Sequence, residues 1–210
     1  MMKRALLPLA FAAAMCASTA HAAIGITATP AVDPYGGPTP TYDFEADTAA
    51  ITGGSRVFGD ITGQHVEPLG SNSWYYSVGP TDGSPATLTL AGGLVESISL
   101  LWGTVDDYNT LELFDSLNNL LGTVTGSQVI SGGTFGSSSR LVTLALTGDT
   151  QSVAKLKFTS TSNAFEFDNV AVTAAVPEPT TWMMLILGML GVGFAMRRKA
   201  SDDSVRIRYA

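Results

Sequence analysis

Short runs in which polar and apolar residues alternate fill the middle of the chain, and turn residues separate them about every ten positions. We find no long stretch with apolar residues at helical spacing. Alternation with β-branched and aromatic residues favours strands, so the pattern predicts an all-β domain, a β-sandwich or jelly roll. The predicted strands are Tyr42–Glu45, Ser73–Val78, Thr87–Leu90, Glu96–Leu101, Leu111–Phe114, Leu120–Thr125, Leu141–Leu146, Ala154–Ser160 and Phe165–Val172.

The segments between these runs have the composition of turns and loops. Asp115–Asn119 lies between two apolar runs, and asparagine tolerates the left-handed backbone of a tight hairpin, so we expect a hairpin tip there. Gly- and Ser-rich Ser131–Ser139 is expected on a surface loop. Four prolines in Ile26–Thr41 predict that residues 23–41 form an extended lead-in outside the sheet, and residues 42–176 form the sandwich.

The first 22 residues have the three parts of an export signal. Lys3 and Arg4 precede the apolar run Ala5–Ala17, which is too short to span a bilayer comfortably. Ala20 and Ala22 place small side chains where signal peptidase requires them. We therefore expect a signal helix over residues 1–22, with cleavage after Ala22.

Residues 23–176 contain no cysteine, because Cys16 lies in the signal segment. Disulfides are thus excluded, and the fold must be held by apolar burial, strand pairing or a bound ion. These residues carry four cations and fifteen carboxylates, a net charge of −11 with histidine neutral. Such an acidic surface repels phosphate backbones, so nucleic acid is not an expected partner.

Near the C-terminus lies the segment VPEPTTWMMLILGMLGVGFAMRRKA, residues 176–200, and ten more residues follow it. Pro177 and Pro179 lack amide donors and end the sheet. Fifteen uncharged residues, Trp182–Met196, then predict a short transmembrane helix of about 22 Å against a hydrocarbon core of about 30 Å. Arg197, Arg198 and Lys199 form a membrane stop and place residues 201–210 in the cytoplasm as a tail. On topology alone, a permanent single-span anchor is the alternative.

The order of Pro177-Glu178-Pro179, a short apolar helix and a basic stop resembles the PEP-CTERM sorting signal of Gram-negative bacteria, here residues 177–200. The resemblance implies recognition by an exosortase, a membrane-embedded cysteine protease or transpeptidase, near the sorting motif. It also implies that the precursor stays at the inner membrane transiently, loses the helix, and reaches the cell surface or extracellular matrix. Trp102–Leu111, Leu121–Gly126 and Ser160–Val170 are similar to segments of one subfamily of these exosortase-dependent proteins.

Four carboxylates are candidate ligands for a structural calcium ion. On an extended strand, Phe165, Phe167 and Asn169 share one face, while Glu166, Asp168 and Val170 share the other. If the last strand lies beside the first, as is common in jelly rolls, Glu166 or Asp168 approaches Asp43 and Glu45. Ca²⁺ takes oxygen ligands and would replace missing disulfides. The alternative is that these are solvated side chains, and otherwise we expect no cofactor.

Aromatic and polar residues at 102–109 are candidates for sugar binding. Trp102 and Tyr108 offer rings that stack on a pyranose, and Asp106 and Asn109 offer groups that bind its hydroxyls. The alternative is a core tryptophan beside an Asp/Asn-rich turn. The aromatic strand Trp74–Tyr76 is also expected to pack.

Catalysis has little support in the sequence. His65 is the sole histidine after signal removal and is expected on the surface, and the chain lacks a Gly-x-Ser-x-Gly elbow, a Cys/His cluster or a phosphate loop. We therefore expect a non-enzymatic surface or matrix protein, structural or adhesive in the exopolysaccharide layer of a biofilm. The alternatives are a carbohydrate-binding module and, less favoured, an extracellular glycosidase.

Overall fold

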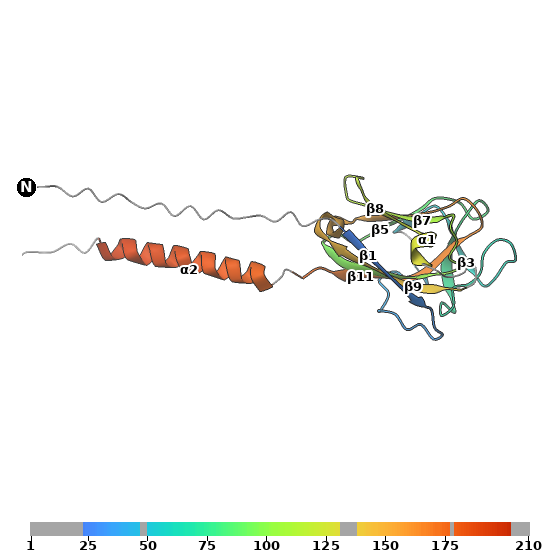
Figure 1. Ribbon diagram of the computed structural model, residues 1–210, viewed down its shortest axis with the longest axis horizontal. Helices are drawn as coiled ribbons and strands as arrows, with labels where there is room; N and C mark the ends of the chain where they lie inside the picture. The colour runs from blue at the N-terminus through green and yellow to red at the C-terminus, as the bar shows by residue number, and fades with distance from the viewer. Residues whose placement is uncertain (1–22, 47–49, 131–137, 177–178, 203–210) are drawn as a thin grey trace, which may run out of the picture.

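The computed structural model of the chain describes residues 23–46, 50–130, 138–176 and 179–202. Within these ranges two antiparallel sheets dominate the fold (Figure 1). One sheet has six strands in the order β1-β9-β6-β11-β4-β3, and the other has five in the order β2-β5-β10-β7-β8. This arrangement confirms the predicted all-β class.

The six-stranded sheet consists of β1 (Ala23–Pro30), β3 (Ser55–Phe58), β4 (Trp74–Val78), β6 (Val95–Trp102), β9 (Arg140–Thr147) and β11 (Phe165–Ala174). The five-stranded sheet consists of β2 (Ile51–Thr52), β5 (Ala86–Thr89), β7 (Asn109–Phe114), β8 (Leu120–Thr125) and β10 (Lys155–Ser160). Two short helical turns, α1 (Gly126–Val129) and η1 (Gly148–Ser152), connect strands. The long helix α2 (Pro179–Asp202) follows β11.

Every predicted run except Tyr42–Glu45 coincides with a strand. In that run Tyr42 forms an isolated bridge with Val170, and Phe44 has a left-handed backbone with φ of 57°. The Phe44 ring is nevertheless buried in the core. The predicted strand is therefore wrong at this run, because the backbone turns at Phe44 instead of extending.

The predicted lead-in is wrong for its first eight residues, which form the edge strand β1. This strand pairs with β9 along its whole length, from Ala23↔Thr147 to Pro30↔Arg140. Ile24, Ile26 and Ala28 alternate toward the core, and Pro30 ends the strand at an outer edge where a missing donor is tolerated. The prediction was wrong because most prolines of this segment lie after β1 and not within it. The short strands β2 and β3 were also missed.

The core lies between the two sheets and contains a group of stacked aromatic rings. Phe158 of β10 lies parallel to Phe167 of β11, with ring centroids 3.7 Å apart. Trp102 of β6 stacks on Phe165 of β11 at 4.1 Å. All four side chains are fully buried. Burial of each such side chain contributes about 1.5–3 kcal/mol, which holds the sheets together without disulfides.

Strand β11 contains a bulge that changes which side chains face the core. Its pairing with β6 shifts register between Asp168 and Ala171, and Asn169 has a positive φ of 52°. As a result Val170 joins Phe165 and Phe167 in the core, whereas strict alternation placed it with Glu166. The face assignment of Val170 is corrected by this extra residue.

The β7–β8 hairpin confirms the predicted tip at 115–119. Asn118 adopts φ of 65°, and the Asp115 carboxylate accepts hydrogen bonds of 2.8 Å from the backbone amides of Leu117 and Asn119. Ser138 and Ser139 are described, whereas residues 131–137 of the predicted surface loop lie outside the described residues.

Helix α2 confirms that a helix follows the last strand, and its apolar side chains from Met183 to Met196 are exposed. The transmembrane assignment is corrected: in the described ranges, no helix combines the length and the apolar character needed to cross a membrane. The physical reason is length: the uncharged run Trp182–Met196 has fifteen residues, about 22 Å of helix against a hydrocarbon core of about 30 Å.

Candidate functional site

The sorting motif lies in the connection between the sandwich and α2. Strand β11 ends at Ala174, and the amide of Ala175 donates a backbone hydrogen bond to the carbonyl of Leu94 at 2.9 Å. Pro179 is the first residue of α2, a position that suits proline because its missing amide donor has no helical partner there. Pro177 and Glu178 lie outside the described residues, as do Ala20, Ala22 and the rest of the predicted signal segment.

The basic stop occupies the last turns of the same helix. Arg197, Arg198 and Lys199 are helical, and the helix continues to Asp202. Residues 203–210 of the predicted tail lie outside the described residues. The three parts of the sorting segment are therefore arranged in chain order as connector, helix and basic end.

The structure does not form the predicted sugar platform around Trp102. The indole is 0 % exposed because Trp102, Leu100 and Ile98 all point from β6 into the core. Because the indole is fully buried and stacks on Phe165, it presents no exposed face to a pyranose. The alternative of a core tryptophan is the one observed. In the other aromatic strand Tyr75 and Tyr76 are buried, while Trp74 stays partly exposed.

The polar members of that candidate set bind protein groups. Asn109 is buried and donates from Nδ2 to the carbonyls of Thr104 and Ala164, both at 3.3 Å, while its Oδ1 accepts from the Ser160 hydroxyl at 2.8 Å. The Tyr108 hydroxyl lies 2.8 Å from Asp106 Oδ2. These bonds hold the loop after β6 against the segment before β11.

Burial is the main influence on the titration of this pair. It raises the pKa of the Asp106 carboxyl, an effect opposed by the hydrogen bond from Tyr108 and reinforced by neighbouring Asp107. Burial and the nearby carboxylates also raise the pKa of the Tyr108 hydroxyl well above its usual range. The phenol therefore remains a neutral donor to Asp106 at physiological pH.

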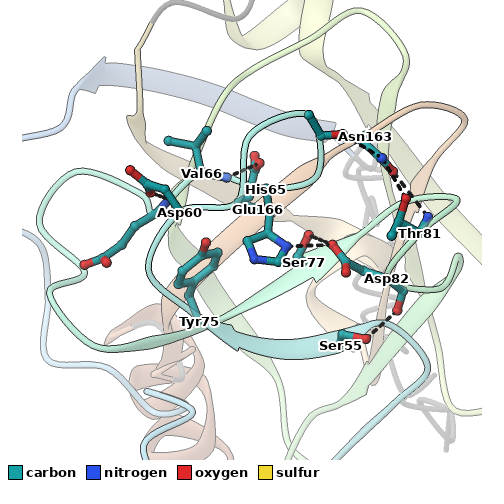
Figure 2. Close-up of polar contacts among 12 residues, drawn as sticks. Ser55, Asp60, His65, Val66, Tyr75, Ser77, Thr81, Asp82, Asn163 and Glu166 are labelled. Atoms are coloured by element: carbon teal, nitrogen blue, oxygen red, sulfur yellow. Dashed lines mark hydrogen bonds and ion pairs between the residues drawn. The ribbon is translucent and has the colours of Figure 1, made fainter.

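Glu166, a candidate calcium ligand, is buried on the face of β11 that points away from the core. Its Oε1 accepts from the backbone amide of Val66 at 2.9 Å (Figure 2). Its Oε2 accepts from the Thr104 hydroxyl at 2.6 Å. Burial raises the pKa of Glu166, and these hydrogen bonds oppose the shift. The carboxylate thus joins two loops to the strand.

Asp168 lies two residues further along β11 and is fully buried. Its Oδ2 accepts from the Ser71 hydroxyl at 2.7 Å, whereas its Oδ1 has no hydrogen-bond partner. Burial raises the pKa of Asp168 to about 7, and the negative charges of Glu45 and Asp43 add to the shift. The hydrogen bond from Ser71 opposes it.

The four candidate calcium ligands do not converge on one point. Asp43 and Glu45 lie close enough to influence Asp168, as the pairing of Tyr42 with Val170 requires, but Glu166 is bound to different loops. Among the described residues no group of three or more His, Cys, Asp or Glu side chains is placed to hold a metal ion. The carboxylates on β11 instead bind the loop containing Val66 and Ser71.

A buried cluster around His65 was not predicted from the sequence. His65 is 4 % exposed, which corrects the expectation that it lies on the surface. Its Nδ1 lies 3.0 Å from Asp82 Oδ2, and the Ser77 hydroxyl donates to the same oxygen at 2.6 Å (Figure 2). A second residue of β4, Tyr75, packs edge-on against the imidazole. The Thr-Asp-Gly turn at 81–83 was the available signal, because aspartate there is well placed to bind nearby side chains.

This Ser, His and Asp arrangement does not activate a nucleophile. The serine hydroxyl points to the carboxylate and not to the imidazole, and His65 Nε2 has no hydrogen-bond partner. Nucleophilic catalysis would require the serine proton to be accepted by the histidine. Ser77 is also fully buried, so the cluster fastens the 79–83 turn and the 59–67 segment to β4.

Comparison with known proteins identifies one segment. A family model described as the PEP-CTERM protein-sorting motif matches residues 175–199. Searches of curated proteins and of solved structures gave no match. The chain therefore carries a PEP-CTERM sorting motif at the connector and helix described above, and this motif supports export and exosortase-dependent sorting.

Proposed function

We propose that this protein is exported, cut by an exosortase near Pro177-Glu178-Pro179, and retained at the cell surface or in the extracellular matrix. The observation that carries the proposal is the matched sorting motif at 175–199, directly after the last strand of the sandwich. In this proposal residues 23–176 are the working protein. Signal peptidase and the exosortase are its processing partners, and the inner membrane is a transient one.

The amino-acid sequence of the connector supports this use. Two prolines lack amide donors, and the residues before them are restricted to extended backbone. A protease binds substrate most readily as an extended segment whose backbone groups are free to pair with the enzyme. The exposed apolar side chains of α2 supply the surface that a membrane-embedded enzyme would hold before the cut.

For the sandwich we propose a structural or adhesive role in the exopolysaccharide layer, without enzymatic activity. Its buried polar groups are engaged in fastening loops: Asp82 binds His65 and Ser77, and Glu166 binds Val66 and Thr104. Such groups hold the fold rigid and leave its outer surfaces for contacts. A stable two-sheet unit without disulfides suits a matrix component that must persist outside the cell.

Mass analysis of the surface protein tests the processing step. In a host with an active exosortase, we expect a mature chain that begins at Ala23 and lacks Trp182–Met196. In a strain without the enzyme, the precursor should keep the helix. A Pro177→Ala/Pro179→Ala variant should accumulate uncut, whereas Ser201→Ala, a change downstream in the same helix, should be processed normally. A mature chain that retains Trp182–Met196 in the active strain would refute the proposal.

A further inference from the structure

The outer face of the five-stranded sheet carries two neighbouring lysines, although the molecule as a whole is acidic. Leu156 and Phe158 of β10 point into the core, so Lys155 and Lys157 point outward from the central strand of that sheet. They are two of the four cations in residues 23–176. At about 3.3 Å per residue, positions two apart on a strand lie about 7 Å from each other on one face.

Strand register surrounds the lysines with hydroxyl groups and one aromatic ring. Lys155 pairs with Thr89 on β5 and with Phe114 on β7, and Lys157 pairs with Thr87 and Glu112. The two lysines, Thr87, Thr89 and Phe114, together with Thr52 and Asn118, line an open hollow of about 370 Å³. This volume lies within the range of about 300–1,000 Å³ that is typical of small-molecule sites.

Both ammonium groups are held in place and keep donors for a ligand. Lys155 Nζ donates to Asn118 Oδ1 at 2.6 Å, and Lys157 Nζ lies 2.8 Å from Glu112 Oε2. An ammonium has three donors, so each lysine retains further capacity. The other two cations are placed differently: Arg56 donates to backbone carbonyls and lies over Trp74, and Nε of Arg140 is buried.

We propose that this hollow binds carboxylate-bearing sugar residues of an acidic extracellular polysaccharide. The threonine hydroxyls and the Asn118 amide match sugar hydroxyls, Phe114 offers an apolar edge for a ring face, and the lysines match the carboxylate. The inference rests on the proposed function, because it names the matrix partner through which the sandwich is retained.

The net charge of −11 opposes binding of any polyanion, but it opposes nucleic acid more strongly than a uronic-acid polymer, whose charge density is lower. Charges farther apart than about 8 Å are largely screened at physiological ionic strength, so contacts inside the hollow decide the binding. Duplex DNA presents a charge about every 1.7 Å, which two lysines cannot offset against fifteen carboxylates. A uronic-acid polymer carries at most one carboxylate per ring, so repulsion from the rest of the surface is weaker.

Affinity electrophoresis of the exported protein tests the site. Native gels would contain polygalacturonate as the acidic probe or dextran as the neutral one, and retardation at several polymer concentrations gives a Kd. We expect retardation by polygalacturonate and none by dextran. Lys155→Gln/Lys157→Gln should weaken binding about tenfold, whereas Lys155→Arg/Lys157→Arg should stay within about twofold of the native Kd. Glu112→Gln, which removes a competing carboxylate, should strengthen binding about twofold.

Several results would overturn the inference. One is retardation by dextran equal to that by polygalacturonate. Another is native affinity in the double glutamine variant when its melting temperature is unchanged. A third is single-stranded DNA that competes as well as polygalacturonate does. Intact mass of the same preparations separates this failure from failure of the proposed function. A correctly cut protein that does not bind polygalacturonate would refute the sugar site alone. An uncut protein would refute the sorting proposal.

Discussion

Replacement of Asp168 by asparagine should make the protein more stable at neutral pH. The carboxyl is fully buried, and its pKa is raised from 3.8 to about 7 in the folded state. The folded protein therefore holds this proton more tightly than the unfolded chain does. Asparagine keeps an oxygen that accepts from Ser71, and its amide takes the place of the protonated hydroxyl. The variant thus imitates the neutral native state at every pH.

The sign and size of this change in stability follow from proton linkage. A raised folded pKa gives stability that is present below about pH 4 and is lost as the pH rises to about 7. Each pKa unit is worth about 1.4 kcal/mol, so Asp168 lowers the free energy of unfolding by about 2–4 kcal/mol at pH 8, allowing for local relaxation. Burial of Glu166 acts in the same direction, but that residue is present in both proteins and its effect cancels in the difference.

Urea unfolding followed by circular dichroism at several pH values measures this difference. We expect Asp168→Asn to gain about 2–4 kcal/mol over the native protein at pH 8 and little at pH 4. Asp107→Asn, the same change at an exposed carboxylate, is the control and should stay within about 0.5 kcal/mol throughout. Parallel curves for native protein and Asp168→Asn from pH 4 to pH 8 would refute the reasoning, because they would mean that the buried carboxylate does not alter proton binding.

Three further predictions concern the core, a close backbone approach and bound metal. Phe167→Ala should lower the free energy of unfolding by about 3–5 kcal/mol in urea titration, because the ring is fully buried and stacks on Phe158; a loss below about 1 kcal/mol would contradict the stacked core. Gly126→Ala should lower the melting temperature, because the new Cβ would clash with the Asp106 carbonyl oxygen, and an unchanged value would contradict this close backbone approach. EDTA should leave the melting temperature unchanged, since Glu166 and Asp168 accept protein hydrogen bonds; a drop would reveal a stabilising ion.

The matched motif and the strand pattern were accessible from the sequence because both depend on local order. Alternation identifies strands such as β6 and β10 from their own residues, and the sorting segment is defined by the order of its parts. Even there, the transmembrane assignment drawn from the apolar run was not confirmed among the described residues. The candidate sugar and calcium residues could not be settled in the same way, because their exposure depends on other segments.

Tertiary structure decided which polar side chains are buried. Alternation puts Glu166 and Asp168 on the noncore face of β11, but loops about a hundred residues earlier in the chain cover that face and bind both carboxylates. His65 is buried by the same packing.

Sequence by itself determined that alternating segments would form two-faced strands and that a sorting motif would follow the last one. Composition could not distinguish Trp102, which is enclosed between the sheets, from Trp74, which is 39 % exposed near an edge. Nor could it reveal the bulge that turns Val170 inward or the placement of both lysines on one outer face. The reason is physical: periodicity fixes the direction of a side chain relative to its own strand, whereas exposure is fixed by what packs against that strand from elsewhere in the chain.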